Sequence, residues 1–289
     1  MSSPEFEAGA VRVGSRVPAR IVVLDGRQRT TRRDQLAAEE PLEIRLEAAG
    51  QQHSLAITMR TPGADFELAA GFLLSEGLIT QRDSIDRIRY CIDDEHDDQQ
   101  RYNVVTVALR QAELPDLAGS ARQFPISSSC GVCGRDSIDM LRRRIGAVAP
   151  GPLVAATDLY ALPEIVQAHQ SIFAATGGLH AAALFDAVQP GKALAVREDV
   201  GRHNALDKLI GWALLNGRLP LTQAIVLVSG RVSFEIVQKC AAAGVPILCA
   251  VSAPSSLAVA TAREIGMTLV GFLRGQRANL YAGAERIIS

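Results

Sequence analysis

Short apolar runs and amphipathic stretches alternate along the last third of the chain. The apolar runs lie at residues 225–228, 247–251 and 269–272, and a stretch with helical periodicity separates each run from the next. Repeated strand–helix–strand order predicts parallel strands joined by right-handed crossovers. Runs that are apolar at every position are typical of strands buried on both faces. The pattern therefore predicts an α/β unit whose central strands are parallel.

Two further elements are predicted ahead of these strands. Residues 158–175 read as one long helix, in which Pro163 falls near the first turns, where a helix tolerates it. Residues 179–185 and 193–196 are expected to pair as a hairpin across a Gln-Pro-Gly turn. We assign these elements and the later strands to a C-terminal unit over residues 151–289. Its remaining predicted helices cover residues 204–215, 234–243 and 255–265.

Alternation of apolar and polar positions predicts a smaller antiparallel α+β region over residues 17–125. The basic stretch 27–33 is expected to be a solvated loop, because acidic residues follow it closely. The acidic stretch 93–100 is interpreted as a solvated hairpin tip rather than as a metal site. The elements predicted here are strands at 20–24, 41–47 and 53–59, a helix at 65–78, and a hairpin formed by 86–92 and 103–109.

Composition narrows the class of protein. The chain has 289 residues, of which 48% are hydrophobic and 21% charged, as in a globular protein with a real core. The net charge of -1 argues against bulk attraction to nucleic acid or to a membrane. No apolar run reaches the roughly 20 residues of a membrane span. Met1–Gly14 lacks the apolar core of a signal peptide, so a cytoplasmic location is expected.

The most reactive-looking segment, at residues 126–150, lies between the two regions. Cys130 and Cys133 form a Cys-x-x-Cys with a glycine after each cysteine, just ahead of a predicted helix at 136–145. Unpaired N–H groups at a helix start and the nearby Arg135 favour thiolate over thiol. Thiolate attacks sulfur and also binds metal, so spacing alone leaves thiol chemistry and metal binding equally open.

The other three cysteines are interpreted differently. Cys240 lies on the apolar side of a predicted helix and Cys249 lies inside a predicted strand, so both are expected to be small core residues. Cys91 is given the same interpretation. Five cysteines without regular spacing fit a reducing compartment better than a disulfide scaffold.

Polar loops are expected to gather at one edge of the predicted parallel sheet. Ligands of open α/β sheets bind at the carboxyl ends of the strands, and helix starts with arginine favour phosphate. An anionic, phosphorylated ligand is therefore expected there, with helix capping as the alternative for a single loop such as 252–256. Arg274 and Arg277 flank Gly275, which lets the backbone approach a phosphate closely. The loops in question are 197–204, 229–233, 252–256 and 272–277.

Motifs spread from about Val17 to the C-terminus carry a resemblance to a known family. They are Thr61–Pro62–Gly63, Gly71 to Gly77, Ser128 to Gly134, Thr176 to Ala182, Glu198 to Lys208, Ser229–Gly230–Arg231, and Gly271–Phe272 with the tail to Ile287. In this order they resemble the FdhD family, the sulfurtransferases needed to make formate dehydrogenases active. The resemblance rests on all of these motifs together and on their order along the chain, not on any one of them.

The resemblance implies that a cysteine desulfurase loads a persulfide onto Cys130, with Cys133 in support. It implies that the sulfur passes to a molybdenum or tungsten cofactor with two pterin guanine dinucleotides, Mo-bis(molybdopterin guanine dinucleotide), destined for apo-formate dehydrogenase. GDP would be a partial mimic of this cofactor. The resemblance also implies a homodimer and a cytidine-deaminase-like fold with a mixed, mostly parallel sheet. The cofactor-binding residues that it implies are Phe272, Leu273, Arg274, Gly275, Gln276 and Arg277.

Deaminase chemistry itself is not expected. Zinc deaminases carry His-x-Glu followed by a Cys-x-x-Cys, whereas Ala182 follows His180 here and the two cysteines come first. Two rival functions stay open on the sequence. One is a structural protein that binds metal through Cys130 and Cys133, and the other is a cofactor-binding chaperone without sulfur chemistry.

Overall fold

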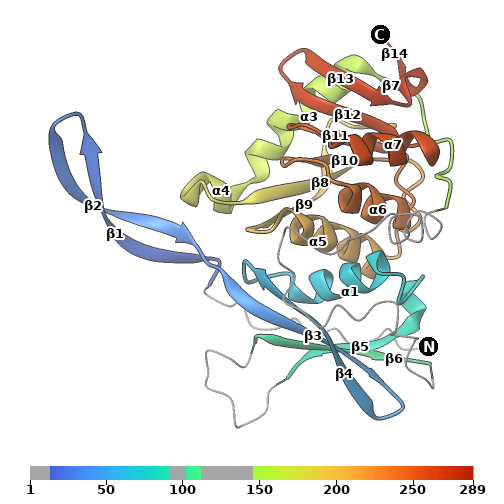
Figure 1. Cartoon of the computed structure of the whole chain (residues 1–289), viewed down its shortest axis with the longest axis horizontal. Helices are drawn as coiled ribbons and strands as arrows, with labels where there is room; N and C mark the ends of the chain where they lie inside the picture. The colour runs from blue at the N-terminus through green and yellow to red at the C-terminus, as the bar shows by residue number, and fades with distance from the viewer. Residues whose placement is uncertain (1–13, 92–101, 112–145, 289) are drawn as a thin grey trace.

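The computed structural model of the chain describes residues 14–91, 102–111 and 146–288. Two sheets lie at opposite ends of the molecule, with helices α1 and α5 packed between them (Figure 1). Helix α1 spans Asp65–Ser75 and helix α5 spans Arg202–Leu215. Within the described ranges, no helix is both long and apolar enough to cross a membrane.

A six-stranded sheet forms the C-terminal part, in the order β13-β12-β11-β10-β8-β9. Strands β10, β11 and β12 are mutually parallel, as predicted, but the other three neighbouring pairs are antiparallel. The expectation of a mixed sheet and that of a hairpin formed by 179–185 and 193–196 are confirmed, but the expectation that most of the pairing is parallel is wrong. The physical reason is that a hairpin closes each side of the sheet, and tight turns join only antiparallel strands. The strands are β8 (His180–Asp186), β9 (Ala193–Asp199), β10 (Ala224–Val228), β11 (Ile247–Ala250), β12 (Thr268–Arg274) and β13 (Arg277–Ala282).

Helices cover both faces of this sheet, and the strand residues alternate between two cores. Leu184, Val226 and Leu248 belong to the larger core, beneath α5 and two further helices. Phe185 and Ile225 belong to the smaller core, beneath α3. Because both faces are covered, the parallel strands are apolar at nearly every position. The further helices are α6 (Phe234–Ala242), α7 (Ser256–Glu264) and α3 (Ala156–His169).

The single helix predicted at 158–175 is wrong in one respect, because it is broken at Gln170. Gln170 has φ -83° and ψ 71°, outside the helical region, and a separate helix α4 (Ser171–Thr176) follows it. The carboxylate of Glu198 accepts hydrogen bonds from the backbone N–H groups of Ile172 and Phe173 at 3.1 and 2.8 Å. These bonds satisfy donors that a new helix leaves unpaired. The cap comes from a distant strand, so the local pattern could not reveal it.

A four-stranded sheet in the order β4-β3-β6-β5 forms the N-terminal part. The predicted strand pairs β3–β4 and β5–β6 are antiparallel, but β3 and β6 pair in parallel, which the sequence did not predict. The central strands β3 and β6 direct Leu42, Leu46 and Val107 into the larger core. The strands are β3 (Glu40–Ala48), β4 (Gln51–Arg60), β5 (Ile85–Tyr90) and β6 (Val104–Leu109).

The basic stretch predicted as a loop is instead part of a strand. Strands β1 (Arg16–Asp25) and β2 (Gln28–Ala37) form a two-stranded hairpin that extends away from both sheets (Figure 1). Most of its side chains are exposed, so the prediction of solvation is confirmed and the prediction of a loop is wrong. Both faces of the ribbon meet solvent, which lets charged residues occupy a strand without a burial penalty. The minor elements are β7 (Val154–Ala155), β14 (Ile287–Ile288), η1 (Arg82–Ser84) and η2 (Ala284–Arg286).

Helices α1 and α5 cross at two glycines. A Cβ atom on Gly71 would overlap the carbonyl oxygen of Asp207, and one on Gly211 would overlap that of Glu67. Only glycine allows the two backbones to touch in this way. The larger core therefore runs without a break from the N-terminal sheet to the C-terminal one. The domain division at 17–125, 126–150 and 151–289 stays a prediction.

Candidate functional site

The predicted polar edge is present. Strands β9, β10, β11 and β12 point their carboxyl ends to one edge of the six-stranded sheet, and the antiparallel β8 begins there, with His180 opposite Asp199. The loops at this edge are joined by backbone hydrogen bonds. Val232 N–H donates to the Ala253 carbonyl at 3.1 Å, and Phe272 N–H donates to the Ser252 carbonyl at 3.1 Å. The loops after β10, β11 and β12 therefore form one continuous surface.

Phe272 is held in a strained backbone conformation at this edge. Its φ is 53°, in the left-handed region that bulky residues avoid. The pairing of β12 with β13 is irregular between Gly271 and Arg274, so the strand bends at Phe272. A conformation of this kind costs of order 1–3 kcal/mol and persists only where the surroundings enforce it. Strain of this kind concentrates at ligand sites, which makes Phe272 a candidate contact.

The six residues predicted to bind the cofactor divide into two groups. The side chain of Leu273 is fully buried in the smaller core, so any contact of this residue with a ligand would be through its backbone. Arg274 and Arg277 are exposed and lie opposite each other at the turn between β12 and β13, where Gly275 has φ 52°. Within the described ranges neither arginine has an ion pair. The geometry leaves both guanidinium groups available to an anion, and cofactor binding by this turn stays a prediction.

A second cationic group lies on the other side of the same edge. His180 begins β8, Arg202 begins α5, and Arg231 follows β10. Gly230 fits between them: a Cβ built there would lie 3.3 Å from Nδ1 of His180 and 3.5 Å from Cβ of Arg202. Burial and then the charge of Arg202 lower the pKa of His180, and Arg231 contributes in the same direction. At neutral pH this histidine is uncharged.

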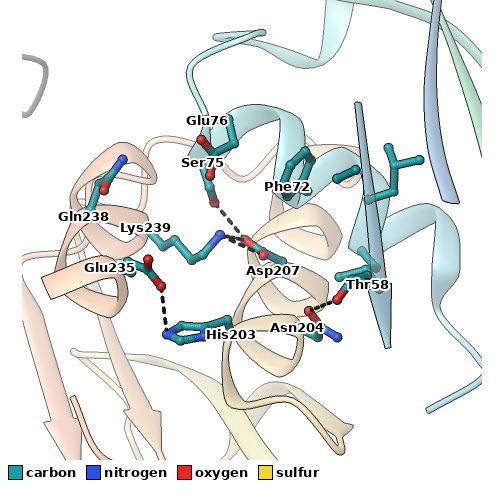
Figure 2. A pocket seen from close by; sticks show the side chains of 13 residues that line it. Thr58, Phe72, Ser75, Glu76, His203, Asn204, Asp207, Glu235, Gln238 and Lys239 are labelled. Atoms are coloured by element: carbon teal, nitrogen blue, oxygen red, sulfur yellow. Dashed lines mark hydrogen bonds and ion pairs between the residues drawn. The ribbon is translucent and has the colours of Figure 1, made fainter. Parts of the chain in front are cut away.

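His203 points toward a different partner. Its Nε2 lies 3.2 Å from Oγ of Ser233 and 3.3 Å from Oε2 of Glu235. Burial lowers the pKa of His203 to about 4, against the opposing charge of Glu235. Figure 2 shows the ring lining a small polar cavity, beside Glu235. Within the loop 197–204, which is predicted to lie at the ligand edge, and the start of α5 that follows it, Arg202 is therefore the better candidate for an anion contact than His203.

The cavity in Figure 2 is bounded by α1, α5, α6 and the strands β3 and β4. Lys239 donates to both carboxylate oxygens of Asp207 at 2.8 Å, and Ser75 donates to the same carboxylate at 2.9 Å. Burial raises the pKa of Asp207, while Lys239 and Ser75 oppose that shift. The volume is about 40 Å³, which suits a water molecule and not a nucleotide. The cavity is therefore a buried polar junction between helices.

Two of the sequence motifs meet in a second buried network. Asp199 accepts from the Thr61 backbone N–H at 3.1 Å and pairs with Lys208 at 2.6 Å. Lys208 also donates to the Thr61 carbonyl at 2.8 Å, and Asn204 donates to Asp199 at 3.2 Å. Side-chain exposure of Lys208 and Asp199 is 2% and 0%, so each charge depends on the other. The sequence analysis did not predict this structural role. The adjacent charged residues Asp207 and Lys208, within the otherwise apolar helix α5, could have indicated it.

The predicted sulfur site lies outside the described residues. This applies to Cys130 and Cys133, to the helix predicted at 136–145 and to the acidic tip at 93–100. Cys240 and Cys249 are fully buried, and burial raises the pKa of both thiols, that of Cys249 to about 12. Their prediction as core residues is confirmed. In the part of the chain that the structure describes, no group of three or more His, Cys, Asp or Glu side chains could hold a metal ion.

Known proteins are similar to this chain over nearly its whole length. The model of the FdhD/NarQ family matches residues 37–288. The sulfur carrier protein FdhD of Mycolicibacterium paratuberculosis is 50% identical over 270 residues, which cover 93% of this chain and 97% of that protein. The sulfur carrier protein FdhD of Streptomyces coelicolor is 52% identical over 262 residues, 89% of this chain and 90% of that protein.

A solved structure agrees with the same assignment. It is the crystal structure of a protein from Desulfotalea psychrophila, described as a formate dehydrogenase accessory protein. The TM-score is 0.72 at 26% identity, and the match covers 94% of this chain and 99% of that one. The likeness to cytidine deaminases is not tested by these matches and stays a prediction. The matched family, the close relatives and the shared fold together assign this chain to the FdhD/NarQ family.

Proposed function

We propose that this chain is a sulfur carrier that takes persulfide sulfur from a cysteine desulfurase onto Cys130 and delivers it to a molybdenum or tungsten bis-pterin guanine dinucleotide cofactor. The recipient of the sulfurated cofactor is apo-formate dehydrogenase. The observation that carries the proposal is the set of relatives named sulfur carrier proteins, about half identical to this chain over nearly its full length. The Cys-x-x-Cys supplies residues suited to the chemistry.

The loading step needs only a thiolate and a donor persulfide. The Cys130 thiolate attacks the outer sulfur of the persulfide on the desulfurase, which forms a new S–S bond. The S–S bond of the donor breaks, and the desulfurase cysteine leaves as a thiolate. No net oxidation occurs, because one persulfide replaces another. Cys133 is proposed to support Cys130, and the glycines beside both cysteines suit a segment that must reach two partners.

The cofactor is proposed to bind as substrate at the polar edge of the six-stranded sheet. The exposed Arg274 and Arg277 lie at that edge next to the strained Phe272. Arginine side chains bind phosphate through paired hydrogen bonds, and an aromatic ring can stack on guanine. GDP serves as a probe of this binding. The active protein is proposed to be a cytoplasmic homodimer, and light scattering of the purified chain tests the dimer by its mass.

Mass spectrometry of the purified chain after incubation with a cysteine desulfurase and cysteine tests the sulfur step. We expect one added sulfur, about 32 Da, on the peptide that contains Cys130. Cys240 and Cys249 serve as internal controls, because they are buried and their pKa values are raised. Sulfur on either of these residues, or none on Cys130, would contradict the proposal.

The two rival functions predict different results. A metal-binding structural protein would hold about one zinc per chain and lose it in a Cys130→Ser/Cys133→Ser double variant. A chaperone without sulfur chemistry would still activate formate dehydrogenase with Cys130→Ala. We expect the Cys130→Ala chain to fold and to bind GDP but to leave formate dehydrogenase inactive in cells that lack their own accessory protein.

A further inference from the structure

We propose that Arg202, Arg231 and His180 form a subsite for a diphosphate group at the carboxyl edge of the six-stranded sheet. The subsite lies where β8 begins and where β9 and β10 end, whereas the Arg274 turn belongs to β12 and β13 at the other side of the sheet (Figure 1). The identity of the ligand, a guanine dinucleotide, rests on the proposed function. The existence of an anion site is argued from the side chains of this chain.

The charges of both arginines act on His180, so the three side chains lie near one another. The loop after β10 packs closely against both His180 and Arg202 at Gly230. A Cβ atom added to Gly230 would lie 3.3 Å from Nδ1 of His180 and 3.5 Å from Cβ of Arg202. Ser229 fixes the loop there, because its hydroxyl accepts from the Ala181 N–H at 2.9 Å and its N–H donates to the Ala181 carbonyl at 2.9 Å. Arg231 follows Gly230, and its charge acts on His180, as that of Arg202 at the start of α5 does.

Arg202 has an unsatisfied donor. Its Nε atom is buried and has no hydrogen-bond acceptor among the described residues. A buried donor without a partner is unfavourable, and such donors in folded proteins call for an explanation. Arg231 is exposed and makes no ion pair with any residue in the described ranges. An oxyanion at this position would accept from both guanidinium groups.

The neighbouring acids neutralise the two arginines only in part. Asp199 is bound to Lys208 at 2.6 Å, so that pair is neutral overall. Glu235 lies 3.3 Å from the uncharged His203 and supplies one negative charge against the two arginines. His180 and His203 are uncharged at neutral pH, because burial and the nearby arginine lower the pKa of each. The group therefore carries an excess of positive charge, which is the arrangement that binds phosphate.

The chemistry favours a diphosphate over an uncharged ligand. Two guanidinium groups offer paired N–H donors to two phosphate groups, and the neutral His180 can add another hydrogen bond. The cofactor proposed above carries two diphosphate groups, one in each guanine dinucleotide. The two diphosphate groups of one cofactor match in number the two arginine pairs at this edge, Arg202 with Arg231 and Arg274 with Arg277.

Calorimetric titration of the full chain with inorganic pyrophosphate tests the subsite. We expect Arg202→Gln and Arg231→Gln each to weaken binding by about ten- to a hundred-fold, since each variant removes a charge-assisted contact. Lys192→Gln is the matched control: Lys192 is an exposed cation in the β8–β9 turn at the opposite edge of the sheet. It should bind pyrophosphate as the unaltered chain does. Arg231 is exposed, so its variant keeps the test valid if Arg202→Gln fails to fold.

Equal affinity in Arg231→Gln and Lys192→Gln would falsify the subsite, and so would a lack of pyrophosphate binding by the unaltered chain. The proposed function is tested by a different measurement, the loading of sulfur onto Cys130, which does not use these arginines. A chain that loses pyrophosphate in the arginine variants but takes no sulfur would keep the subsite and refute the sulfur carrier.

Discussion

At the scale of a single residue, Phe272 shows how strain and function can be separated. Its backbone has φ 53°, which glycine adopts without penalty and alanine does not. Phe272→Gly and Phe272→Ala both remove the ring, so their difference in stability reports the backbone strain. We expect the glycine variant to be more stable than the alanine variant by about 1 kcal/mol in chemical denaturation.

The same two variants report the role of the ring. Stacking of one base on an aromatic side chain is worth roughly 1–3 kcal/mol, so both variants should bind GDP about five- to a hundred-fold more weakly. Phe272→Tyr should retain most of the affinity and serves as the control. An alanine variant as stable as the glycine variant would show that the left-handed conformation is not strained in solution.

Single residues were predicted best where one chemical property decided their position. Cys240 and Cys249 were placed in the core from their apolar surroundings alone, and both are fully buried. The resemblance places Leu273 among the cofactor-binding residues, yet its side chain is buried in the smaller core with Val270, because the pairing of β12 is irregular between Gly271 and Arg274. The Asp199–Lys208 pair depends on a contact with Thr61, more than a hundred residues earlier in the chain. No local pattern carries such a contact.

At the scale of elements, the crossing of α1 and α5 leads to a second prediction. The backbones touch at Gly71 and Gly211, so a methyl group on Gly71 has to push the helices apart. Overpacking of this kind costs typically 1–3 kcal/mol. We expect Gly71→Ala to lower the free energy of unfolding by at least about 1 kcal/mol, measured by denaturant titration.

The control for this prediction is another glycine. Gly191 is exposed, and a Cβ built on it meets no atom within 4 Å. Gly191→Ala should therefore change stability by less than about 0.5 kcal/mol. If Gly71→Ala is equally harmless, the two helices are not in backbone contact in solution.

Element types could be predicted largely from periodicity, and the failures share one cause. The strands of the parallel set and the helices between them follow the hydrophobic pattern closely. The helix at 158–175 is interrupted by a cap from Glu198, and the strand β2 is held by ladder hydrogen bonds to β1 instead of by an apolar face. In both cases a contact from another element overrides the local signal.

At the scale of the whole molecule, the sequence predicts the parallel strands β10, β11 and β12 and the hairpin β8–β9, but not the pairing of β8 with β10 or of β3 with β6. The repeated strand–helix order implies the pairing of β10, β11 and β12, which is confirmed. The parallel pairing of β3 with β6 brings together strands that flank β4, α1 and β5. Such pairing depends on the whole core, which runs from one sheet to the other through α1 and α5. The edge loops follow from the parallel centre, so the candidate site could be located without knowledge of the rest.

The polar junction in Figure 2 makes the stability of the whole molecule depend on pH. Burial lowers the pKa of His203 to about 4, with Arg202, Lys239 and His180 acting in the same direction and Glu235 opposing them. In the unfolded chain a histidine titrates near 6.5. Above about pH 7 it is neutral in both states and contributes no pH dependence. As the pH falls below about 6.5, the unfolded chain binds a proton that the folded chain rejects, so the free energy of unfolding falls until about pH 4.

Between pH 7 and pH 5, His203 should therefore lower the free energy of unfolding by on the order of 2 kcal/mol. Denaturant titration at both pH values measures this change. In His203→Gln we expect the change to shrink by about the same amount, since glutamine does not titrate. The pKa of His180 is also lowered, so a smaller pH dependence should remain in the His203→Gln variant. Glu47, whose pKa is lowered by hydrogen bonds from Arg89 and Gln52, loses its contribution to stability only at more acidic pH, below this range.

The control is His53→Gln, on the exposed part of β4. An equal pH dependence of stability in His203→Gln and His53→Gln would show that His203 is not held as a neutral, buried ring.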